Sequence, residues 1–263
     1  MSSPTDIFEQ ASKFLKEGKK VALCTIVEKI GSGPAEKGTK ILVTEDGETV
    51  GTIGGGNFER GVREGALKAI KEGKSKSLRF ALYGGARKDE VDTGMWCGGT
   101  TTVFIDVIEP KSKLVIVGSG HIALPTYRMA DLLGFKITVV DDERGTLTKD
   151  RFPNAKRIYH VDFRKALKET SVDEHTYVAI VHGEPKHDLA ALRHFVREKP
   201  AYLGLLGSKR KIIKLMEILK KEGVPRATIK RIHAPIGVDI GAEIPEEIAV
   251  SIAAELVKER RTP

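Results

Sequence analysis

The sequence has no long apolar run and few cysteines. No stretch reaches the roughly 18 apolar residues that a membrane-spanning helix needs, and the polar start MSSPTDIFEQ has no signal-peptide core. Its two cysteines, Cys24 and Cys97, cannot form a disulfide framework, which is typical of a reducing compartment. These absences predict a soluble cytoplasmic protein that does not enter a membrane.

The chain also lacks a basic block interleaved with aromatic residues, which make up only 6% of it. Its 44 Lys and Arg residues and 36 Asp and Glu residues give a net charge of +8, but both signs occur in nearly every segment. Mixed charge of this kind is typical of a solvated surface and not of a nucleic-acid patch. We therefore expect no nucleic-acid partner.

A length of 263 residues suits two domains, and the clearest pattern lies in residues 113–142. A short apolar run at 114–117 is typical of a buried parallel strand, and Gly118, Gly120 and Ala123 follow it in G-x-G-x-x-A spacing. In that motif the first glycine permits a tight turn, the second lets a pyrophosphate approach, and the small third residue lets a helix pack on the strand. We expect a helix over 121–133, with its first N–H groups directed at an anion.

A second strand at 136–140 ends in Asp141 and Asp142. Asp141 stands where an acidic residue of this fold accepts hydrogen bonds from ribose hydroxyls. The pattern then continues with strands and helices in alternation, which predicts a Rossmann-like, doubly wound parallel sheet over 113–263. A relic of the fold that binds no nucleotide is the alternative. The expected strands are 157–160, 177–181 and 202–206, and the expected helices are 164–169, 186–198 and 208–222.

Two of these strand ends carry side chains capable of chemistry, because ligands of such sheets bind at the carboxyl ends of the strands. His182 follows one strand and is a candidate catalytic residue, although a structural histidine explains it equally well. Gly207 and Ser208 follow another, with Ser208 as the expected helix cap. Lys209 and Arg210 place positive charge at that helix start, which the helix dipole disfavours unless an anion binds there.

The pattern of residues 1–108 predicts a smaller α+β domain. A linker at 109–112 would join it to the Rossmann-like domain. Here a hairpin strand leads into Gly54, Gly55 and Gly56 and then a helix, with Asn57 as the expected cap and Glu59 in its first turn. Three successive glycines cost chain entropy, which favours close approach of a ligand over a merely crowded turn. The expected elements are a helix at 6–15 and strands at 21–30, 39–44, 49–53, 78–83 and 100–108.

Cys97 lies between Trp96 and Gly98 in a glycine-flanked loop, where a thiol can be exposed. It is a candidate sulfur nucleophile or soft-metal ligand. The alternative is a cysteine used as a small apolar residue in a turn. Cys24, within an apolar strand, is expected to be an ordinary buried residue.

Five ordered segments together resemble the XdhC/CoxI family, accessory proteins of xanthine dehydrogenase and related molybdenum hydroxylases. The resemblance covers nearly the whole chain. It implies an N-terminal domain with the cysteine motif, a C-terminal Rossmann domain, and dimerisation. The segments are 51–56 with Glu59, 95–99, 118–123 with 140–142, 204–211, and 235–242 leading into 245–252.

This resemblance implies that the protein holds the molybdenum cofactor (molybdopterin or its dinucleotide form), supports its sulfuration, and delivers it to an apo molybdenum hydroxylase. An accessory protein is expected rather than a turnover enzyme, with a cysteine desulfurase as a further partner. Cys97 would be the sulfur relay or a molybdenum contact. The expected cofactor contacts are Gly54, Gly55, Gly56, Glu59, Gly98, Gly118, Gly120, His121, Ala123, Asp141, Asp142, Gly207, Ser208, Lys209 and Arg210.

Two other functions remain open at this point. An NAD(P)-dependent oxidoreductase follows from the Rossmann unit alone, although the sequence shows no clear Lys–His or Tyr–Lys pair to move protons with a hydride. An interaction scaffold with a vestigial nucleotide site is the other alternative.

Overall fold

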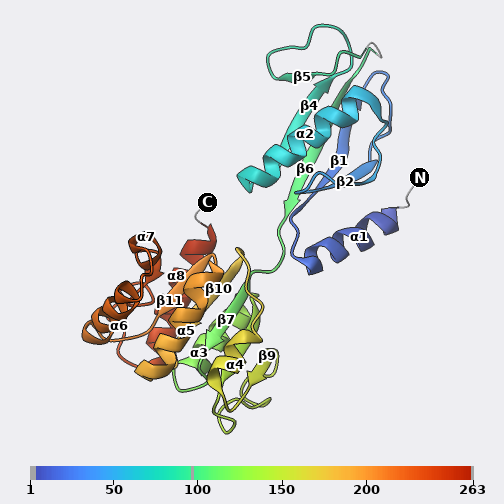
Figure 1. Ribbon diagram of the computed structural model, residues 1–263. Coiled ribbons are helices and arrows are strands. Elements are labelled where there is room, and N and C mark those ends of the chain that lie inside the picture. Colours follow the sequence, from blue (N-terminus) through green and yellow to red (C-terminus); the bar gives the residue numbers. More distant parts are fainter. Residues whose placement is uncertain (1–3, 96–97, 262–263) are drawn as a thin grey trace. The chain divides into compact units, whose positions relative to one another are not determined.

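The computed structural model describes residues 4–95 and 98–261 and shows two compact units, Met1–Pro110 and Lys111–Pro263 (Figure 1). The second unit is built on a parallel sheet, and the first is a smaller α+β unit built on a mostly antiparallel sheet. The expected fold class is confirmed. Among the described residues, no helix combines the length and apolar character that a membrane crossing requires.

The sheet of the first unit has the strand order β3-β2-β1-β6-β4-β5. Neighbouring strands are antiparallel except β4 and β5, and Gly47, with a positive φ, sits in the predicted hairpin turn between β2 and β3. The elements are α1 (Pro4–Glu17), β1 (Val21–Ile30), β2 (Lys40–Thr44), β3 (Thr49–Gly51), α2 (Gly56–Glu72), β4 (Lys76–Ala81), β5 (Glu90–Asp92) and β6 (Thr100–Ile108).

The two helices of this unit cover opposite faces of its sheet, because successive strand side chains point to opposite sides. In β1, Ala22 and Cys24 belong to the core under α2, together with Phe58 and Val62 of that helix. Val21, the residue before Ala22, instead joins the smaller core under α1. Cys24 is fully buried, as its place in an apolar strand predicts.

The second unit has a six-stranded parallel sheet in the order β12-β11-β10-β7-β8-β9. Read from the other edge, this is the 3-2-1-4-5-6 order of the dinucleotide-binding fold. The elements are β7 (Lys113–Val117), α3 (Ala123–Leu132), β8 (Lys136–Asp141), β9 (Lys156–Tyr159), α4 (Phe163–Lys168), β10 (Thr176–Ile180), α5 (Pro185–Glu198), β11 (Tyr202–Leu205), α6 (Lys209–Lys221), α7 (Arg226–Ile229), β12 (Ile232–His233) and α8 (Pro245–Arg261).

Helices cover both faces of this parallel sheet. Val115 and Val117 of β7 pack in one core with α4, α5 and α6, whereas Leu114 and Ile116 pack in the other with α3 and α8. Because β7 lies between β8 and β10, the chain reverses its winding direction at β7, and the loops that follow β7 and β10 diverge there. Such a switch point is where ligands of this fold bind.

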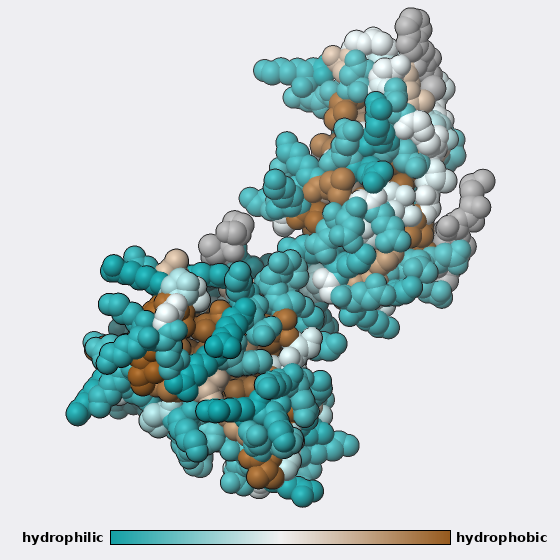
Figure 2. Space-filling view, in the orientation of Figure 1, coloured by the Kyte–Doolittle hydropathy of each residue, from teal (hydrophilic) through white to brown (hydrophobic). Residues whose placement is uncertain are grey.

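Three short elements, β5, α7 and β12, were not predicted from the sequence; they have three, four and two residues. Segments of this length are too short to show a hydrophobic period. The longer elements match within a few residues at each end. In the view of Figure 2, hydrophilic residues cover most of the visible surface of each unit.

Candidate functional site

The glycine-rich turn after β7 has the geometry that its motif predicts. Gly118 has φ +107°, and a Cβ there would lie 2.7 Å from the Cα of His182, so only glycine fits. A Cβ on Gly120 would meet no atom within 4 Å. Ala123 begins α3 and is fully buried against the sheet. The turn is therefore tight at its first glycine and open to a ligand at its second.

Asp141, at the end of β8, holds this turn. Its Oδ2 accepts hydrogen bonds from both the N–H and the hydroxyl of Ser119, and its Oδ1 accepts hydrogen bonds from the N–H groups of Asp142 and Glu143. Burial by itself would raise the pKa of Asp141, but the interactions with His182 and Ser119 outweigh it and lower the pKa. Asp141 is thus an ionised, inward-facing carboxylate, and the ribose contact predicted for it stays a prediction.

His182 follows β10 and faces the same carboxylates. Its Nε2 lies 3.4 Å from Asp141 Oδ1 and 3.6 Å from Asp142 Oδ1. Burial alone would lower the pKa of His182, but the two aspartates outweigh burial and raise it. The topology therefore brings the predicted residues Gly118, Asp141, Asp142 and His182 together at the carboxyl ends of β7, β8 and β10.

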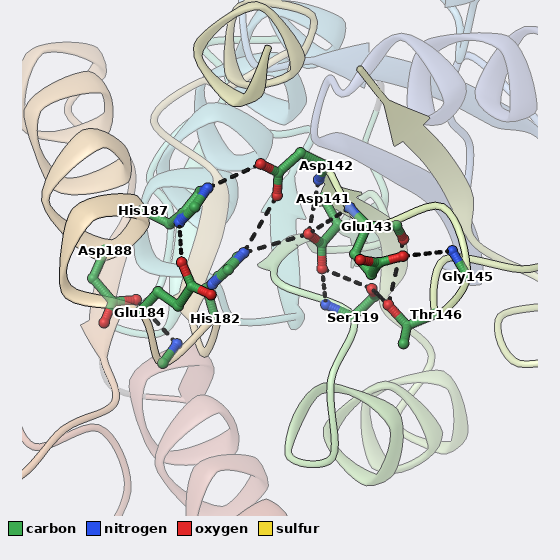
Figure 3. Close-up of polar contacts among 11 residues, drawn as sticks. Ser119, Asp141, Asp142, Glu143, Gly145, Thr146, His182, Glu184, His187 and Asp188 are labelled. Carbon is green, nitrogen blue, oxygen red and sulfur yellow. Dashed lines mark hydrogen bonds and ion pairs between the residues drawn. The ribbon is translucent and has the colours of Figure 1, made fainter. Parts of the chain in front are cut away.

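His187, in the first turn of α5, completes this group and was not predicted. Its ring stacks on that of His182, with centroids 4.3 Å apart and planes at 8°. Its Nε2 lies 2.9 Å from Asp142 Oδ2, at hydrogen-bond distance. Its Nδ1 lies 2.9 Å from a carboxylate oxygen of Glu184, but this second contact does not have the alignment of a hydrogen bond. Figure 3 shows both rings directed at Asp142. The sequence signal that could have found it is a second histidine five residues after His182, the histidine that follows the strand.

The start of α6, after β11, is the other predicted anion-binding point of this unit. Ser208 is its N-cap and accepts a hydrogen bond from the N–H of Lys211, as predicted. Lys209 and Arg210 are exposed, and neither forms an ion pair with a residue in the part of the chain that the structure describes. Gly207, before the cap, is half-buried. This helix start combines free N–H groups with two cationic side chains.

The triple glycine of the first unit also forms an irregular turn. Gly54, Gly55 and Gly56 have positive φ, and a Cβ on Gly55 or Gly56 would meet nothing within 4 Å. Glu59 closes the turn, because its Oε2 accepts hydrogen bonds from the N–H groups of Ile53 and Gly55 and from the Thr52 hydroxyl.

The expected cap of this helix was wrong. The N-cap is Gly55, without a side-chain cap bond. The helix therefore starts before Asn57. The backbone N–H groups of Ile53 and Gly55, just before the helix, donate to the Glu59 carboxylate and not to a capping side chain.

Cys97 lies outside the described residues, so its predicted role as nucleophile and metal ligand stays a prediction. Gly98, which follows it, has φ +82° and donates its N–H to the carbonyl of Leu82. The other cysteine, Cys24, is unsuited to chemistry, because burial raises the pKa of its thiol to about 12. His121, at the glycine turn of the second unit, is exposed.

Comparisons with known proteins agree with this architecture. Residues 14–81 match the model of the XdhC and CoxI family, and residues 114–256 match that of the XdhC Rossmann domain. A Bacillus halodurans crystal structure described as a xanthine dehydrogenase superposes with a TM-score of 0.53 at 22% identity, covering 96% of this chain and 95% of that one. At that identity the likeness shows the fold alone.

Three curated relatives are similar in sequence. Uncharacterized protein YqeB of Escherichia coli (strain K12) is 36% identical over 96% of this chain and 46% of its own length. A probable subunit of xanthine dehydrogenase from Bacillus subtilis (strain 168) is 30% identical over 62% of this chain and 47% of its own. The molybdenum cofactor insertion chaperone PaoD of Escherichia coli (strain K12) is 24% identical over 97% and 88%.

The chain thus spans about half the length of the first two of these relatives, whereas it matches most of the third. Its two units correspond in order to the two family models, with the glycine turn, the acidic end of β8 and His182 all inside the second match. The chain belongs to the XdhC and CoxI family.

Proposed function

We propose that this protein binds the molybdenum cofactor and inserts it into an apo molybdenum hydroxylase of the xanthine dehydrogenase type. The observation that carries the proposal is the open glycine turn, where a Cβ on Gly120 would meet nothing within 4 Å. Molybdopterin ends in a phosphate and its dinucleotide form contains a diphosphate, the kind of group that such a turn accepts. The relative named as a molybdenum cofactor insertion chaperone supports the choice of cargo.

Within this proposal, the residues of the second unit bind the phosphate end of the cofactor. The N–H groups from Gly120 to Ala123 face the phosphate, and His121 lies exposed beside them. Lys209 and Arg210 add positive charge to the same edge of the sheet. The helix cap Ser208 and the preceding Gly207 would offer further polar contacts there. Asp141 and Asp142, at the end of β8, are the proposed contacts for a ribose of the dinucleotide form.

The first unit would contribute the sulfur chemistry. We propose Cys97 as a sulfur relay supplied by a cysteine desulfurase, or as a transient molybdenum ligand. Gly98 and the turn formed by Gly54, Gly55, Gly56 and Glu59 would offer backbone contacts to the cofactor. A cytoplasmic homodimer is the proposed working form.

The test is to purify the protein from cells that make molybdopterin and to measure bound molybdenum and pterin per chain. We expect near-stoichiometric cofactor in the wild type. In Gly120→Ala we expect at least about a tenfold loss, since a methyl group would occupy the approach of the phosphate. Gly84→Ala is the control, because Gly84 is exposed and a Cβ there also meets nothing within 4 Å. Cofactor absent from the wild type, or equal in Gly120→Ala, would contradict the proposal.

The Cys97→Ser variant separates the two roles proposed for that thiol. If Cys97 relays sulfur, the variant keeps the cofactor but no longer activates the apo hydroxylase. If it is a molybdenum ligand, both cofactor retention and activation fall. If cofactor retention and hydroxylase activation were both unchanged, Cys97 would have neither role.

An NAD(P)-dependent oxidoreductase is the second candidate, favoured by the 3-2-1-4-5-6 strand order and the acidic end of β8. In that function His182, which follows β10 beside the switch point of the sheet, would be the candidate proton donor. Titration with NADH, followed by the fluorescence of the nicotinamide, distinguishes the two functions. Stoichiometric binding together with turnover of a carbonyl substrate would favour the oxidoreductase, whereas no binding would exclude it.

A further inference from the structure

We infer that Asp142, His182 and His187 form a binding site for one divalent transition-metal ion in the second unit. One ligand atom from each of the three side chains lies within 4.8 Å of the other two. They come from three separate segments, the end of β8, the end of β10 and the first turn of α5 (Figure 3). All three ligands belong to the second unit and Cys97 is not one of them, and the inference does not depend on the proposed function.

The orientation of the rings supports a shared ion. His182 and His187 stack face to face at 4.3 Å, and the Nε2 atoms of both point at the carboxylate of Asp142, at 3.6 and 2.9 Å. Two imidazole nitrogens and a carboxylate oxygen are therefore aimed at one small volume. Zinc binds such ligands at about 2.0–2.2 Å, so small movements of the three side chains would suffice.

The surroundings of His187 provide a second argument. Both ring nitrogens face a carboxylate oxygen at 2.9 Å, Nδ1 toward Glu184 and Nε2 toward Asp142. A neutral imidazole carries only one N–H, so the two carboxylates favour a positive charge at this ring, supplied by a second proton or by a metal ion on one nitrogen. A metal ion on Nε2 is compatible with both contacts, because the Nδ1 proton then faces the carboxylate of Glu184, which lies at ion-pair distance on the side where metal-bound histidines have a carboxylate partner.

The ligand chemistry identifies the class of ion. Two imidazoles and one carboxylate suit Zn²⁺, Fe²⁺, Co²⁺ or Ni²⁺, whereas Mg²⁺ and Ca²⁺ prefer oxygen ligands alone. Phe163 packs edge-on against both rings, at 5.4 and 4.6 Å between centroids, and restricts their rotation. Three protein ligands leave a coordination position open for water or for an anion bound at the glycine turn.

The experiment uses the full chain carrying Cys97→Ser, so that this thiol cannot bind the probe metal. After treatment with a chelator, Zn²⁺ is titrated by calorimetry, and Co²⁺ by its visible absorption. We expect one equivalent to bind, and at least a tenfold loss of affinity in His182→Gln, His187→Gln and Asp142→Asn. His175→Gln is the control, because this exposed histidine also lies beside a carboxylate, that of Glu174; it should bind as the parent does.

Loss of folding is tested separately by thermal unfolding without metal. Each ligand variant should melt close to the parent, and only the parent and His175→Gln should gain thermal stability with Zn²⁺. Absence of stoichiometric binding in the parent, or equal affinity in His187→Gln, would overturn the site. If a ligand variant fails to fold, the other two variants and the parent titration still decide the question. Failure here leaves molybdenum cofactor retention, measured in the Gly120→Ala experiment, unaffected.

Discussion

The ammonium group of Lys211 lies 2.6 Å from the carboxylate of Asp188, a side chain with no exposed surface. Asp188 also accepts a hydrogen bond from the N–H of Gly183. The pair therefore connects the start of α6 to the first turn of α5, which carries His187, and through Gly183 to the preceding loop, which carries His182. The sequence did not indicate this ion pair, because Lys211 is the third of three consecutive basic residues at the start of α6 and nothing in the sequence marks Asp188 as its partner.

Lys211→Met should destabilise the protein by about 3 kcal/mol, since it leaves the buried carboxylate of Asp188 without its cation. Urea unfolding at neutral pH measures the change. Lys214→Met is the control, because Lys214 is exposed one turn further along α6, and its effect should stay within about 0.5 kcal/mol. Equal stability of the two variants would show that the buried ion pair does not hold the loop.

The glycine turn predicts opposite behaviour for its two glycines. Gly118→Ala should lower the free energy of unfolding by at least about 2 kcal/mol, because φ is +107° and the added Cβ would lie 2.7 Å from the backbone of His182. Gly120→Ala should leave stability within about 0.5 kcal/mol of the wild type. Chemical denaturation measures both. A destabilised Gly120→Ala would mean that its space is not open.

Much of the second unit is predictable because its motif is local. The spacing of Gly118, Gly120 and Ala123 fixes a strand, a turn and a helix within ten residues, and buried parallel strands appear as continuous apolar runs. The end of β8 could be located in the same way. What could not be predicted is which of its two aspartates faces inward, since that depends on the orientation of the strand in the folded sheet.

The histidine pair shows a second limit of the sequence. His182 stands at a strand end, a position with a known functional meaning, and was selected for that reason. His187 lies inside a helix, and only the packing of α5 against the sheet brings its ring within 4.3 Å of His182. In the first unit, the hydrogen bonds of Glu59 depend on the backbone path of three glycines, which no residue pattern specifies.

Cys24 should not react with thiol reagents in the folded protein, because it is fully buried and the pKa of its thiol is raised to about 12. The Cys97→Ser variant leaves Cys24 as the remaining thiol of the sequence. We expect no labelling of this variant by an aromatic disulfide at neutral pH, and one equivalent in guanidinium. Rapid labelling of the folded variant would contradict the buried position of β1.

The contact between Asp173 and Lys113 predicts a contribution to stability that depends on pH. Burial alone would raise the pKa of Asp173, but hydrogen bonds from Lys113 and Thr176 outweigh it and lower the pKa. Stability from this carboxylate is therefore present above the usual aspartate pKa and is lost as the pH falls through the lowered value. Because the pair is partly exposed, we expect less than about 1 kcal/mol.

Unfolding free energies measured between pH 6 and about pH 3 test this expectation. As the pH falls, the free energy of unfolding should decrease less in Asp173→Asn than in the wild type. Asp150→Asn removes an exposed carboxylate and should decline as the wild type does. Parallel curves for Asp173→Asn and the wild type would show that the contact does not contribute.

Glu59 should matter to the first unit even without a ligand. Glu59→Ala removes the acceptor shared by Ile53, Gly55 and Thr52, so we expect a loss of about 2 kcal/mol, typical of hydrogen bonds to a charged group. Glu59→Gln keeps one acceptor oxygen and should lose less. Glu64→Ala, on the exposed side of the same helix, is the control and should change stability by less than about 0.5 kcal/mol. If Glu59→Ala matched that control in urea unfolding but lost the cofactor, Glu59 would act through a ligand and not through the turn.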